Sequence, residues 1–212
     1  MTSTSAPVPA PASAREGARR TRLTPERERE LYGAVLDLVR EVGYEAMTMD
    51  AVASRSKCSK ATLYRQWQGK PRLVSAAMRH CKPFSLDGLD TGSLRGDLYE
   101  LARRIGGAKK DIDLMRGVVL AIRKDADLAA AMHEAIIQPE TEAMRGMVER
   151  AVERGEVADD HPSIPFFPHM INGACFSRPM LEQREADTEY LKRYVDTVVL
   201  PLFMPEQRGM PE

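Results

Sequence analysis

The stretch that decides the fold is residues 47–70, MTMDAVASRSKCSKATLYRQWQGK. It predicts one short helix that begins after Thr48, then a tight turn, then a second short helix that begins after Ser59 and ends near Trp67. Two short helices that cross closely need a small residue at the crossing, and Ala53 supplies it. This pattern predicts a helix-turn-helix, in which the second helix is the one that enters a groove of DNA.

The side chains around the turn divide into an apolar and a polar group. Val52, Cys58 and Leu63 are able to fill the small core beneath the two helices. Ser59 caps the second helix, which leaves its first backbone N–H groups directed toward an anion. The other side chains are polar or phenolic, and the arginine and glutamine among them have the chemistry to read guanine or adenine. They are Lys60, Thr62, Tyr64, Arg65 and Gln66.

Helical patterns continue on both sides of this stretch. A capping Thr24 followed by Pro25 predicts the start of a first helix, and Gly43 predicts its end. After Gly69 breaks the chain, Pro71 opens a fourth helix whose apolar residues recur at helical spacing. We expect these elements to form one N-terminal domain.

The segment 83–96 contains one proline and three glycines, and it predicts a turn-rich linker. Beyond it, apolar residues recur at helical spacing as far as Phe203, with no strand-like alternation and no internal repeat. Pro139 lies inside the long helical pattern of residues 125–154 and is expected to kink this helix or to split it in two. The sequence therefore predicts an all-α fold.

Charge is distributed unevenly, although the net charge of the 212 residues is zero. Residues 1–82 hold 15 Lys/Arg and 8 Asp/Glu, whereas residues 83–212 hold 16 Lys/Arg and 23 Asp/Glu. A basic N-terminal part beside an acidic remainder is typical of a DNA-binding head on a larger body. By itself, the asymmetry is equally compatible with chance differences between solvated faces.

The first 22 residues are rich in Ala, Pro, Ser and Thr, and their later part is basic. We expect this segment to be disordered, because it carries too few apolar side chains to form a core. Its arginines suit either an arm that lies along DNA phosphates or a solubilising tail. They are Arg15, Arg19, Arg20 and Arg22.

Several protein classes find no support in the sequence. It has no apolar run of about 18 residues and no basic-then-apolar leader, so we expect neither a membrane span nor secretion. Three widely spaced cysteines fit a reducing, cytoplasmic location better than a disulfide framework. GxGxxG, Walker, HExxH and GxSxG motifs are missing, and an SxxK match at residues 54–57 lacks a companion motif. Adjacent His80 and Cys81 would point to different helix faces, which does not suit a metal site. From these observations together, we predict no enzyme, no cofactor and no metal.

At residues 60–67 the sequence resembles a known family. KATLYRQW, followed by Lys70, is similar to the xxTLYxxF pattern of the TetR family of transcriptional regulators, with Trp67 in place of the commoner Phe. The resemblance covers about residues 25–82. One position departs from it: the turn residue, usually Gly in the family, is Lys57 here and would need a left-handed backbone.

The resemblance implies roles for residues of the motif. Thr48 would cap its helix and touch a phosphate, and Tyr64 and Lys70 would also contact phosphates. Residues 60–62 would face base edges or the DNA backbone at the groove. The predicted DNA-binding residues are Thr48, Lys57, Ser59, Lys60, Ala61, Thr62, Tyr64, Arg65, Gln66 and Lys70.

For the C-terminal part, the resemblance implies a helical bundle that dimerises and binds a ligand. The last two helices would form a four-helix dimer interface, with burial inside one chain as the alternative. The candidate interface residues are Ile171, Cys175, Leu191, Tyr194, Val195, Val198 and Leu202. Methionines suit an adaptable apolar pocket, although their helical spacing also fits a plain core. The candidate pocket residues are Leu101, Ile105, Met115, Val118, Val119, Ile122, Met132, Ile136, Met147, Phe166, Phe167 and Met170.

These observations predict an all-α protein with a three-helix DNA-binding domain before a helical bundle. The predicted segments are a disordered basic arm (1–22), a helix-turn-helix DNA-binding domain (23–82), a linker (83–96), a helical regulatory and dimerisation domain (97–204) and a tail (205–212). The implied function is that of a homodimeric repressor released from a pseudo-palindromic DNA operator by a small apolar ligand. The alternative is a helical partner-binding module, or a ligand-independent regulator or activator with the same fold.

Overall fold

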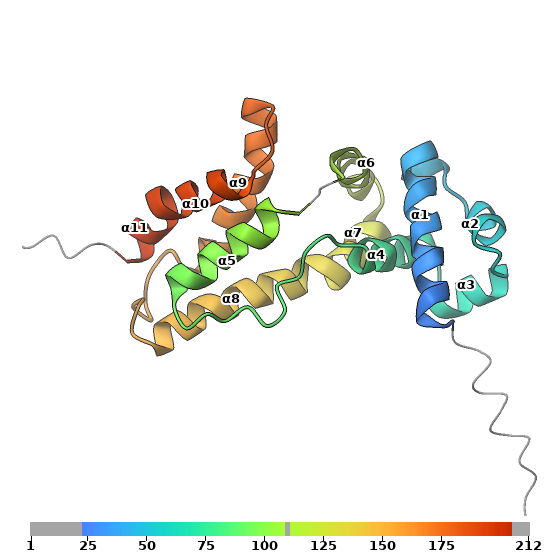
Figure 1. The fold of residues 1–212 in the computed structure, drawn as a ribbon. Coiled ribbons are helices and arrows are strands. Elements are labelled where there is room, and N and C mark those ends of the chain that lie inside the picture. Colours follow the sequence, from blue (N-terminus) through green and yellow to red (C-terminus); the bar gives the residue numbers. More distant parts are fainter. Residues whose placement is uncertain (1–22, 109–110, 205–212) are drawn as a thin grey trace, which may run out of the picture. The chain divides into compact units, whose positions relative to one another are not determined.

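The computed structural model describes residues 23–108 and 111–204, and every regular element in those two ranges is a helix (Figure 1). The predicted all-α fold is thereby confirmed. The chain divides into two compact units, with the boundary between His80 and Cys81. The predicted N-terminal arm and the predicted tail lie outside the described residues. Within the described ranges, no helix has the length and apolar character needed to cross a bilayer.

The first unit, described for residues 23–80, contains helices whose ends follow local capping signals. They are α1 (Pro25–Ala46), α2 (Met49–Ser56), α3 (Lys60–Trp67) and α4 (Lys70–His80). Thr24 caps α1, because its hydroxyl oxygen accepts a hydrogen bond from the backbone N–H of Arg27 at 3.4 Å. At Gly43, φ is 80° and ψ is 161°, which interrupts the helical backbone in a conformation that favours glycine. The predicted stop is therefore a kink, after which α1 continues to Ala46.

Helix α1 is the centre of the first unit and contacts both α2 and α4 (Figure 1). Trp67 at the end of α3 meets Tyr32 of α1 edge to face, with ring centroids 5.9 Å apart. The indole N–H of Trp67 donates to the Tyr32 hydroxyl at 3.3 Å, so the polar atom of this buried ring has a partner. Leu63 is fully buried one turn earlier. Trp67 thus closes the core of this unit.

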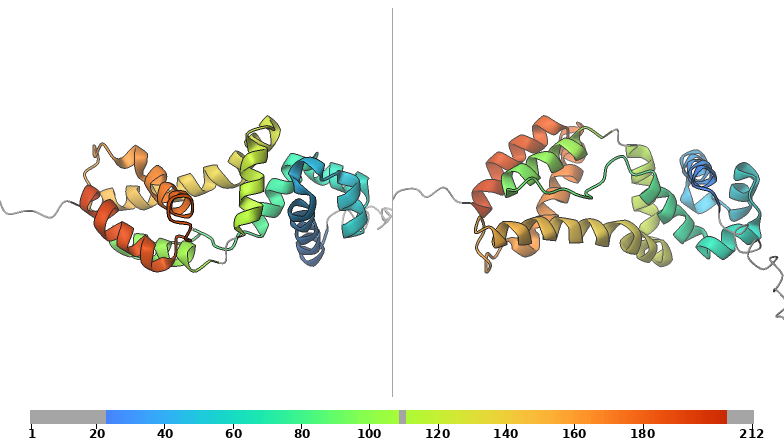
Figure 2. Two further views of the ribbon diagram at one scale, coloured as in Figure 1. Left: turned by 90° about the horizontal axis from the view of Figure 1, so that it is seen from above. Right: turned by 60° about the horizontal axis from the view of Figure 1, so that its bottom comes forward.

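The second unit is described for residues 81–108 and 111–204. Its elements are α5 (Leu94–Gly106), α6 (Ile112–Ile122), α7 (Ala126–Met132), a π-helical turn (His133–Ile137), α8 (Gln138–Glu153), a 3₁₀ turn (Ile164–Phe166), α9 (Phe167–Glu182), α10 (Thr188–Tyr194), a second π-helical turn (Val195–Val199) and α11 (Leu200–Phe203). Helix α5 lies alongside α10, and α8 contacts both α5 and α9 (Figures 1 and 2). Buried apolar side chains from these helices form the main core of the unit.

The long helical pattern around Pro139 is divided into α7, the π-helical turn at residues 133–137 and α8, in agreement with the expected interruption. The π-helical turn comes immediately before α8, whose second residue is Pro139. A proline lacks a backbone N–H and its ring collides with the carbonyl four residues earlier, and one wider turn relieves both problems. The same arrangement recurs where the π-helical turn at residues 195–199 comes before Pro201.

Two glycines permit close approaches at the two ends of α5. A Cβ atom at Gly106 would lie 2.2 Å from the backbone nitrogen of Thr188, so a larger residue would push α5 away from α10. A Cβ atom at Gly96 would lie 2.2 Å from Oγ1 of Thr91. Gly96 belongs to the predicted linker, but α5 begins at Leu94 and includes it.

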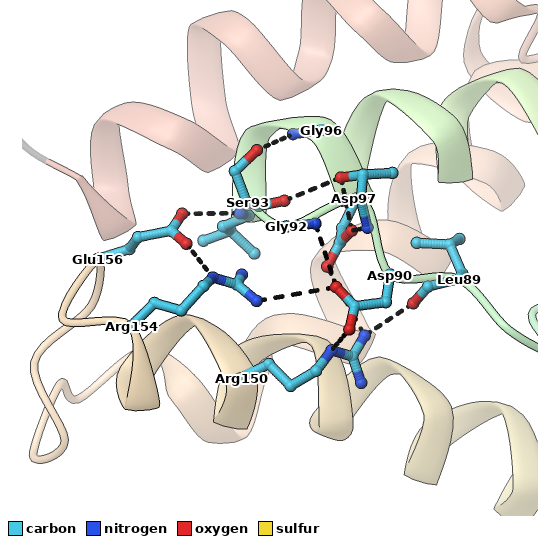
Figure 3. A network of polar contacts seen from close by, with 11 residues as sticks. Leu89, Asp90, Gly92, Ser93, Gly96, Asp97, Arg150, Arg154 and Glu156 are labelled. Atoms are coloured by element: carbon cyan, nitrogen blue, oxygen red, sulfur yellow. Dashed lines mark hydrogen bonds and ion pairs between the residues drawn. The ribbon is translucent and has the colours of Figure 1, made fainter.

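A polar network joins the start of α5 to the end of α8 (Figure 3). Asp97 has no exposed surface, and its Oδ1 accepts hydrogen bonds from the backbone N–H and the hydroxyl of Thr91 at 2.6 and 2.8 Å. Its Oδ2 lies 3.6 Å from Nη2 of Arg150. The same Nη2 donates to the carbonyl oxygen of Leu89 at 2.8 Å. The buried carboxylate is therefore matched by hydrogen-bond donors and by a cation.

The network continues through Glu156, which follows α8 (Figure 3). One of its carboxylate oxygens accepts a hydrogen bond from the backbone N–H of Leu94 at 2.7 Å, where α5 begins. The other oxygen pairs with Arg154. Arg150 and Arg154 both approach the carboxylate of Asp90, at 3.5 and 3.9 Å. Glu156 therefore satisfies a helix-terminal N–H group from 62 residues away in the chain.

Replacing Asp97 with Asn is expected to lower the free energy of unfolding by about 2–3 kcal/mol. The amide would turn an N–H donor toward either Thr91 or Arg150, which are themselves donors, and the charge that balances Arg150 would be lost. Urea denaturation followed by circular dichroism measures the change. Asp159→Asn, which alters an exposed carboxyl group after α8, is the control and is expected to have no effect. Equal stabilities of the two variants would contradict a stabilising role for the network.

Candidate nucleic-acid interface

A capping side chain fixes the start of each helix in the helix-turn-helix. Oγ1 of Thr48 accepts a hydrogen bond from the backbone N–H of Ala51 at 3.1 Å. Oγ of Ser59 accepts one from the backbone N–H of Thr62, also at 3.1 Å. Both predicted caps are confirmed. The N-terminal end of α3 carries the partial positive charge of the helix dipole and suits an anion.

The turn between α2 and α3 is formed by Lys57 in a left-handed backbone, with φ 52° and ψ 37°. The expectation from the sequence is confirmed here. The backbone N–H of Lys57 donates to the carbonyl oxygens of Ala53 and Ser54, and that of Cys58 donates to Ala53 at 3.1 Å. The left-handed conformation costs an L-residue about 1 kcal/mol, which glycine would avoid. In return, the exposed side chain adds a cation beside the turn.

One side of α3 is exposed and mostly polar, and we name it the outer face. Its members are Lys60, Ala61, Tyr64 and Arg65. Ala61 and Arg65 lie on the side opposite the buried Leu63 and Trp67, and Lys60 and Tyr64 are exposed as well. Tyr64 is 49% exposed, so its phenol is accessible to a ligand. The outer face thus presents two cations and a hydroxyl from a helix of eight residues.

Two other predicted DNA-binding residues of α3 are engaged within the unit. Gln66 is half-buried, and its amide nitrogen donates to the carboxylate of Glu28 on α1 at 2.9 Å. It is therefore not brought to the outer face, because one residue of helix turns the side chain by about 100° from Arg65. Thr62 is also half-buried, and its hydroxyl lies 2.9 Å from Oγ of Ser59.

Lys70, the first residue of α4, directs its ammonium group to the end of α1. Its Nζ donates to the carbonyl oxygens of Tyr44 and Glu45 at 3.1 and 3.3 Å. It also lies 4.3 Å from the centroid of the Tyr44 ring. These contacts join α4 to α1. The phosphate contact predicted for Lys70 stays a prediction.

Charged contacts brace α2 against α1. Arg55 makes two hydrogen bonds of 2.7 Å to the carboxylate of Glu41. This contact lowers the pKa of Glu41 and raises the pKa of Arg55. It is therefore intact at neutral pH and is lost only as the pH falls through the lowered pKa of Glu41. Near the other end of α1, Nη2 of Arg27 donates to the carbonyl oxygen of Ser56 at 3.1 Å.

Two residues beside the outer face were not predicted. Gln68 follows α3 in a left-handed conformation and is exposed four residues after Tyr64, so counting along the helix could have found it. Asp50 of α2 lies with Oδ1 2.5 Å from Nζ of Lys60. The hydrogen bond to Asp50 raises the pKa of Lys60. This ion pair forms because α2 and α3 cross, and no local sequence pattern predicts it.

The candidate pocket residues do not all belong to one core cluster. Five belong to the main core of the second unit or pack against it: Leu101, Ile105, Met147, Phe167 and Met170. The others are outside that core, some buried and some exposed: Met115, Val118, Val119, Ile122, Met132, Ile136 and Phe166. Most of these others come from α6, α7 and the π-helical turn after α7, whereas α5, α8 and α9 contribute to the core. Among the described residues, no group of three His, Cys, Asp or Glu is arranged to hold a metal ion.

The candidate interface residues also separate in the structure. Ile171, Leu191 and Val195 are buried in the core of their own unit, and Cys175 and Tyr194 pack against it. Val198 and Leu202 are exposed. Three unpredicted apolar residues of α9 are exposed as well: Phe176, Met180 and Leu181. Helical spacing identifies an apolar face, but the side that meets the chain's own core is decided by packing.

Comparison with known proteins agrees with this geometry. Residues 33–77 match bacterial regulatory proteins of the tetR family, and residues 89–198 match the Tetracyclin repressor-like C-terminal domain. Over 186 residues the chain is 30% identical to the DNA-binding transcriptional repressor TetR of Mycobacteroides abscessus, covering 86% of this chain and 96% of that protein. It is 28% identical over 186 residues to an uncharacterized HTH-type transcriptional regulator of Mycobacterium tuberculosis, covering 82% and 87% of the two chains.

A crystal structure shares the fold at low sequence identity. It is that of a proposed transcriptional regulator from Saccharomonospora viridis in complex with choline, with a TM-score of 0.55 and 11% identity. The match covers 82% of this chain and 98% of that chain. At this level of identity, the likeness concerns the fold alone.

Replacing Lys57 with Gly is expected to raise the free energy of unfolding by about 1 kcal/mol, because glycine adopts the left-handed backbone without a Cβ penalty. Thermal or urea unfolding of the two proteins measures the gain. Lys57→Ala removes the same charge but keeps the Cβ atom, and it is expected to give no comparable gain. If the two variants were stabilised equally, charge and not backbone conformation would be the cause.

Proposed function

The chain belongs to the TetR family of bacterial transcriptional regulators, and from that premise we propose that it is a homodimeric repressor that leaves its operator when a small apolar ligand binds. It is a helix-turn-helix regulator of transcription that binds DNA through its N-terminal domain. The repressor role, the dimer and the ligand go beyond family membership and are what we propose. The exposed outer face of α3 carries the operator-binding part of the proposal.

The outer face has the groups that a major groove requires. The Arg65 guanidinium is exposed and can donate two hydrogen bonds to O6 and N7 of a guanine. The Tyr64 hydroxyl can donate to a phosphate at the edge of the groove, which orients the helix without reading sequence. Thr48 and Lys57 cap the two ends of α2 and would contact the DNA backbone. One helix of eight residues offers few base contacts, so a second copy on a two-fold axis is needed for a tight and specific site.

The exposed apolar residues near the end of the chain support a dimer. Met180 and Leu181 are 83% and 82% exposed, which leaves large apolar side chains in water in the single chain. With Phe176, Val198 and Leu202, they lie on α9, on the last π-helical turn and on α11. We propose that these residues meet their counterparts across a two-fold axis.

The ligand would bind among α5, α8 and α9. Met147 and Met170 are flexible side chains in or against the core there, and they could rearrange around an apolar molecule. The relative that was crystallised in complex with choline supports a small organic ligand in this fold. The name of the Mycobacteroides abscessus relative supports repression.

Release would follow from a population shift. A ligand that prefers one arrangement of the second unit would favour dimers whose two α3 helices no longer match successive major grooves, which lie about 34 Å apart. Reciprocity then requires DNA to weaken ligand binding by the same factor. A ligand without this preference would bind but would not release DNA.

Fluorescence anisotropy with a labelled duplex from the region upstream of the protein's own gene tests the proposal. A scrambled duplex of the same length at equal salt is the comparison. Preferential, salt-sensitive binding to a palindromic stretch is the expected result, and candidate ligands can then be added to the complex. If that region is not preferred, selection from random DNA provides the second test. Failure to enrich any sequence would contradict a sequence-specific regulator.

Arg65→Ala is expected to weaken operator binding by about 1–3 kcal/mol and to relax the preference at one base pair of each half-site. The reason is the loss of a two-pronged contact with one base. Anisotropy with a panel of single-base operator variants measures both effects. Arg40→Ala removes an equal charge from α1 and is expected to leave the base preference unchanged. A uniform loss on all duplexes would reassign Arg65 to phosphate binding.

Met180→Asp is expected to weaken dimerisation by at least about 100-fold, because an unpaired carboxylate would be enclosed in an apolar interface. Sedimentation equilibrium of the full chain measures the dissociation constant. Met115→Asp places the same charge on an exposed residue of α6 and is expected to leave the dimer intact. If both variants associate like the wild type, the interface lies elsewhere on the protein.

A further inference from the structure

A carboxylate on α2 holds one of the cations of the outer face. Asp50 is the second residue of α2, and Lys60 is the first residue of α3. Oδ1 of Asp50 lies 2.5 Å from Nζ of Lys60, and the two side chains are 68% and 52% exposed. An ion pair this exposed is weak in water, so another anion can compete for the ammonium group.

We propose that Asp50 is a specificity-determining residue that restrains the binding of DNA of arbitrary sequence. In the free protein, its carboxylate occupies the place beside Lys60 that a DNA phosphate would take. Lys60 and Arg65 are the cations of the outer face, and Asp50 neutralises one of them. The inference rests on the proposed function, because it concerns the same contact between α3 and DNA.

Binding to arbitrary DNA comes essentially from phosphate contacts, and each contact releases counterions. When Lys60 binds a phosphate, the Asp50 carboxylate stays close to this second anion, and the two negative charges repel each other. A base edge offers Lys60 a different contact from a phosphate. An ammonium group has three N–H donors, so at the operator Lys60 can keep Asp50 and still donate to an acceptor such as O6 or N7 of guanine. Asp50 therefore penalises the arbitrary complex more than the operator complex.

Asp50→Asn tests this role in the full-length protein with an operator duplex and a random-sequence duplex between 50 and 200 mM salt. The amide is isosteric, and it removes both the competitor for Lys60 and the repulsion. The slope of log affinity against log salt on random DNA is expected to steepen by about 0.9, with an affinity gain on the order of tenfold at low salt. A smaller gain is expected on the operator, so the ratio of the two affinities falls. Asp50→Glu keeps the charge and is expected to retain the wild-type slope.

Two further variants separate the ion pair from general electrostatics. Asp37→Asn removes the same charge from an exposed pair on α1, where Arg40 lies 2.6 Å from Asp37, and is expected to change neither slope nor ratio. In a Lys60→Ala background, Asp50→Asn is expected to lose most of its effect, because the partner is gone. Thermal unfolding of each variant verifies that the first unit stays folded.

Equal slopes for Asp50→Asn and Asp37→Asn would overturn the proposal. It would also be overturned if Asp50→Asn acted equally without Lys60, or if it changed the preference at one base pair while leaving the random-DNA slope untouched. The last result would make Asp50 a base-reading residue. A wild-type protein that binds neither duplex would instead contradict the proposed function, and this inference with it.

Discussion

Burial of Leu63 and Trp67 in the first unit, with Trp67 packed against Tyr32 of α1, determines which side of α3 meets the solvent. The two residues are four positions apart and anchor the same side of a helix of only eight residues. Removing each of them from water contributes roughly 1.5–3 kcal/mol, which exceeds what any exposed polar contact of α3 supplies. The bond from Trp67 to the Tyr32 hydroxyl also satisfies the one polar atom of the buried ring. When these two side chains are buried, Tyr64 and Arg65 are left exposed to solvent.

Helix α2 buries Met49 and Val52 and also makes polar contacts with α1. Arg55 with Glu41, and Arg27 with the end of α2, hold it to α1. The left-handed Lys57 then fixes the angle at which α3 leaves the turn. The charge that results on the outer face is moderate, because Asp50 offsets part of it. A sequence-specific regulator benefits from this restraint, since arbitrary DNA competes through charge alone.

In the second unit, α5 is held at both ends. At its start, the buried Asp97 and the capping Glu156 tie it to the end of α8 (Figure 3). At its end, Gly106 has no side chain, so the backbone of α5 can come close to the backbone of Thr188, the first residue of α10. Helix α5, one of the helices that would surround a ligand, is therefore connected both to α8 and to α10. Helix α10 comes before the exposed apolar residues of the second π-helical turn and α11. A ligand that moves α5 or α8 would disturb contacts at both ends of α5.

The elements of this protein could be predicted from the sequence because their signals are local. Thr24, Thr48 and Ser59 each cap a helix by bonding an N–H group three residues away, and Pro139 acts on the turn just before it. The motif KATLYRQW likewise identified the family from adjacent residues. In the candidate site, Lys60, Tyr64 and Arg65 are exposed, and their contacts with DNA stay predictions.

Only the tertiary structure decided which neighbour each side chain meets. Gln66 was predicted to face DNA, yet it contacts Glu28, which lies 38 residues away in the chain. Ile171 and Leu191 face the core of their own unit, while Met180 is left exposed. Helical periodicity distinguishes an apolar side from a polar one, but it carries no information about the partner that covers it. The sequence by itself determined the helices, their caps and the family, whereas the orientation of each face depended on packing between residues distant in the chain.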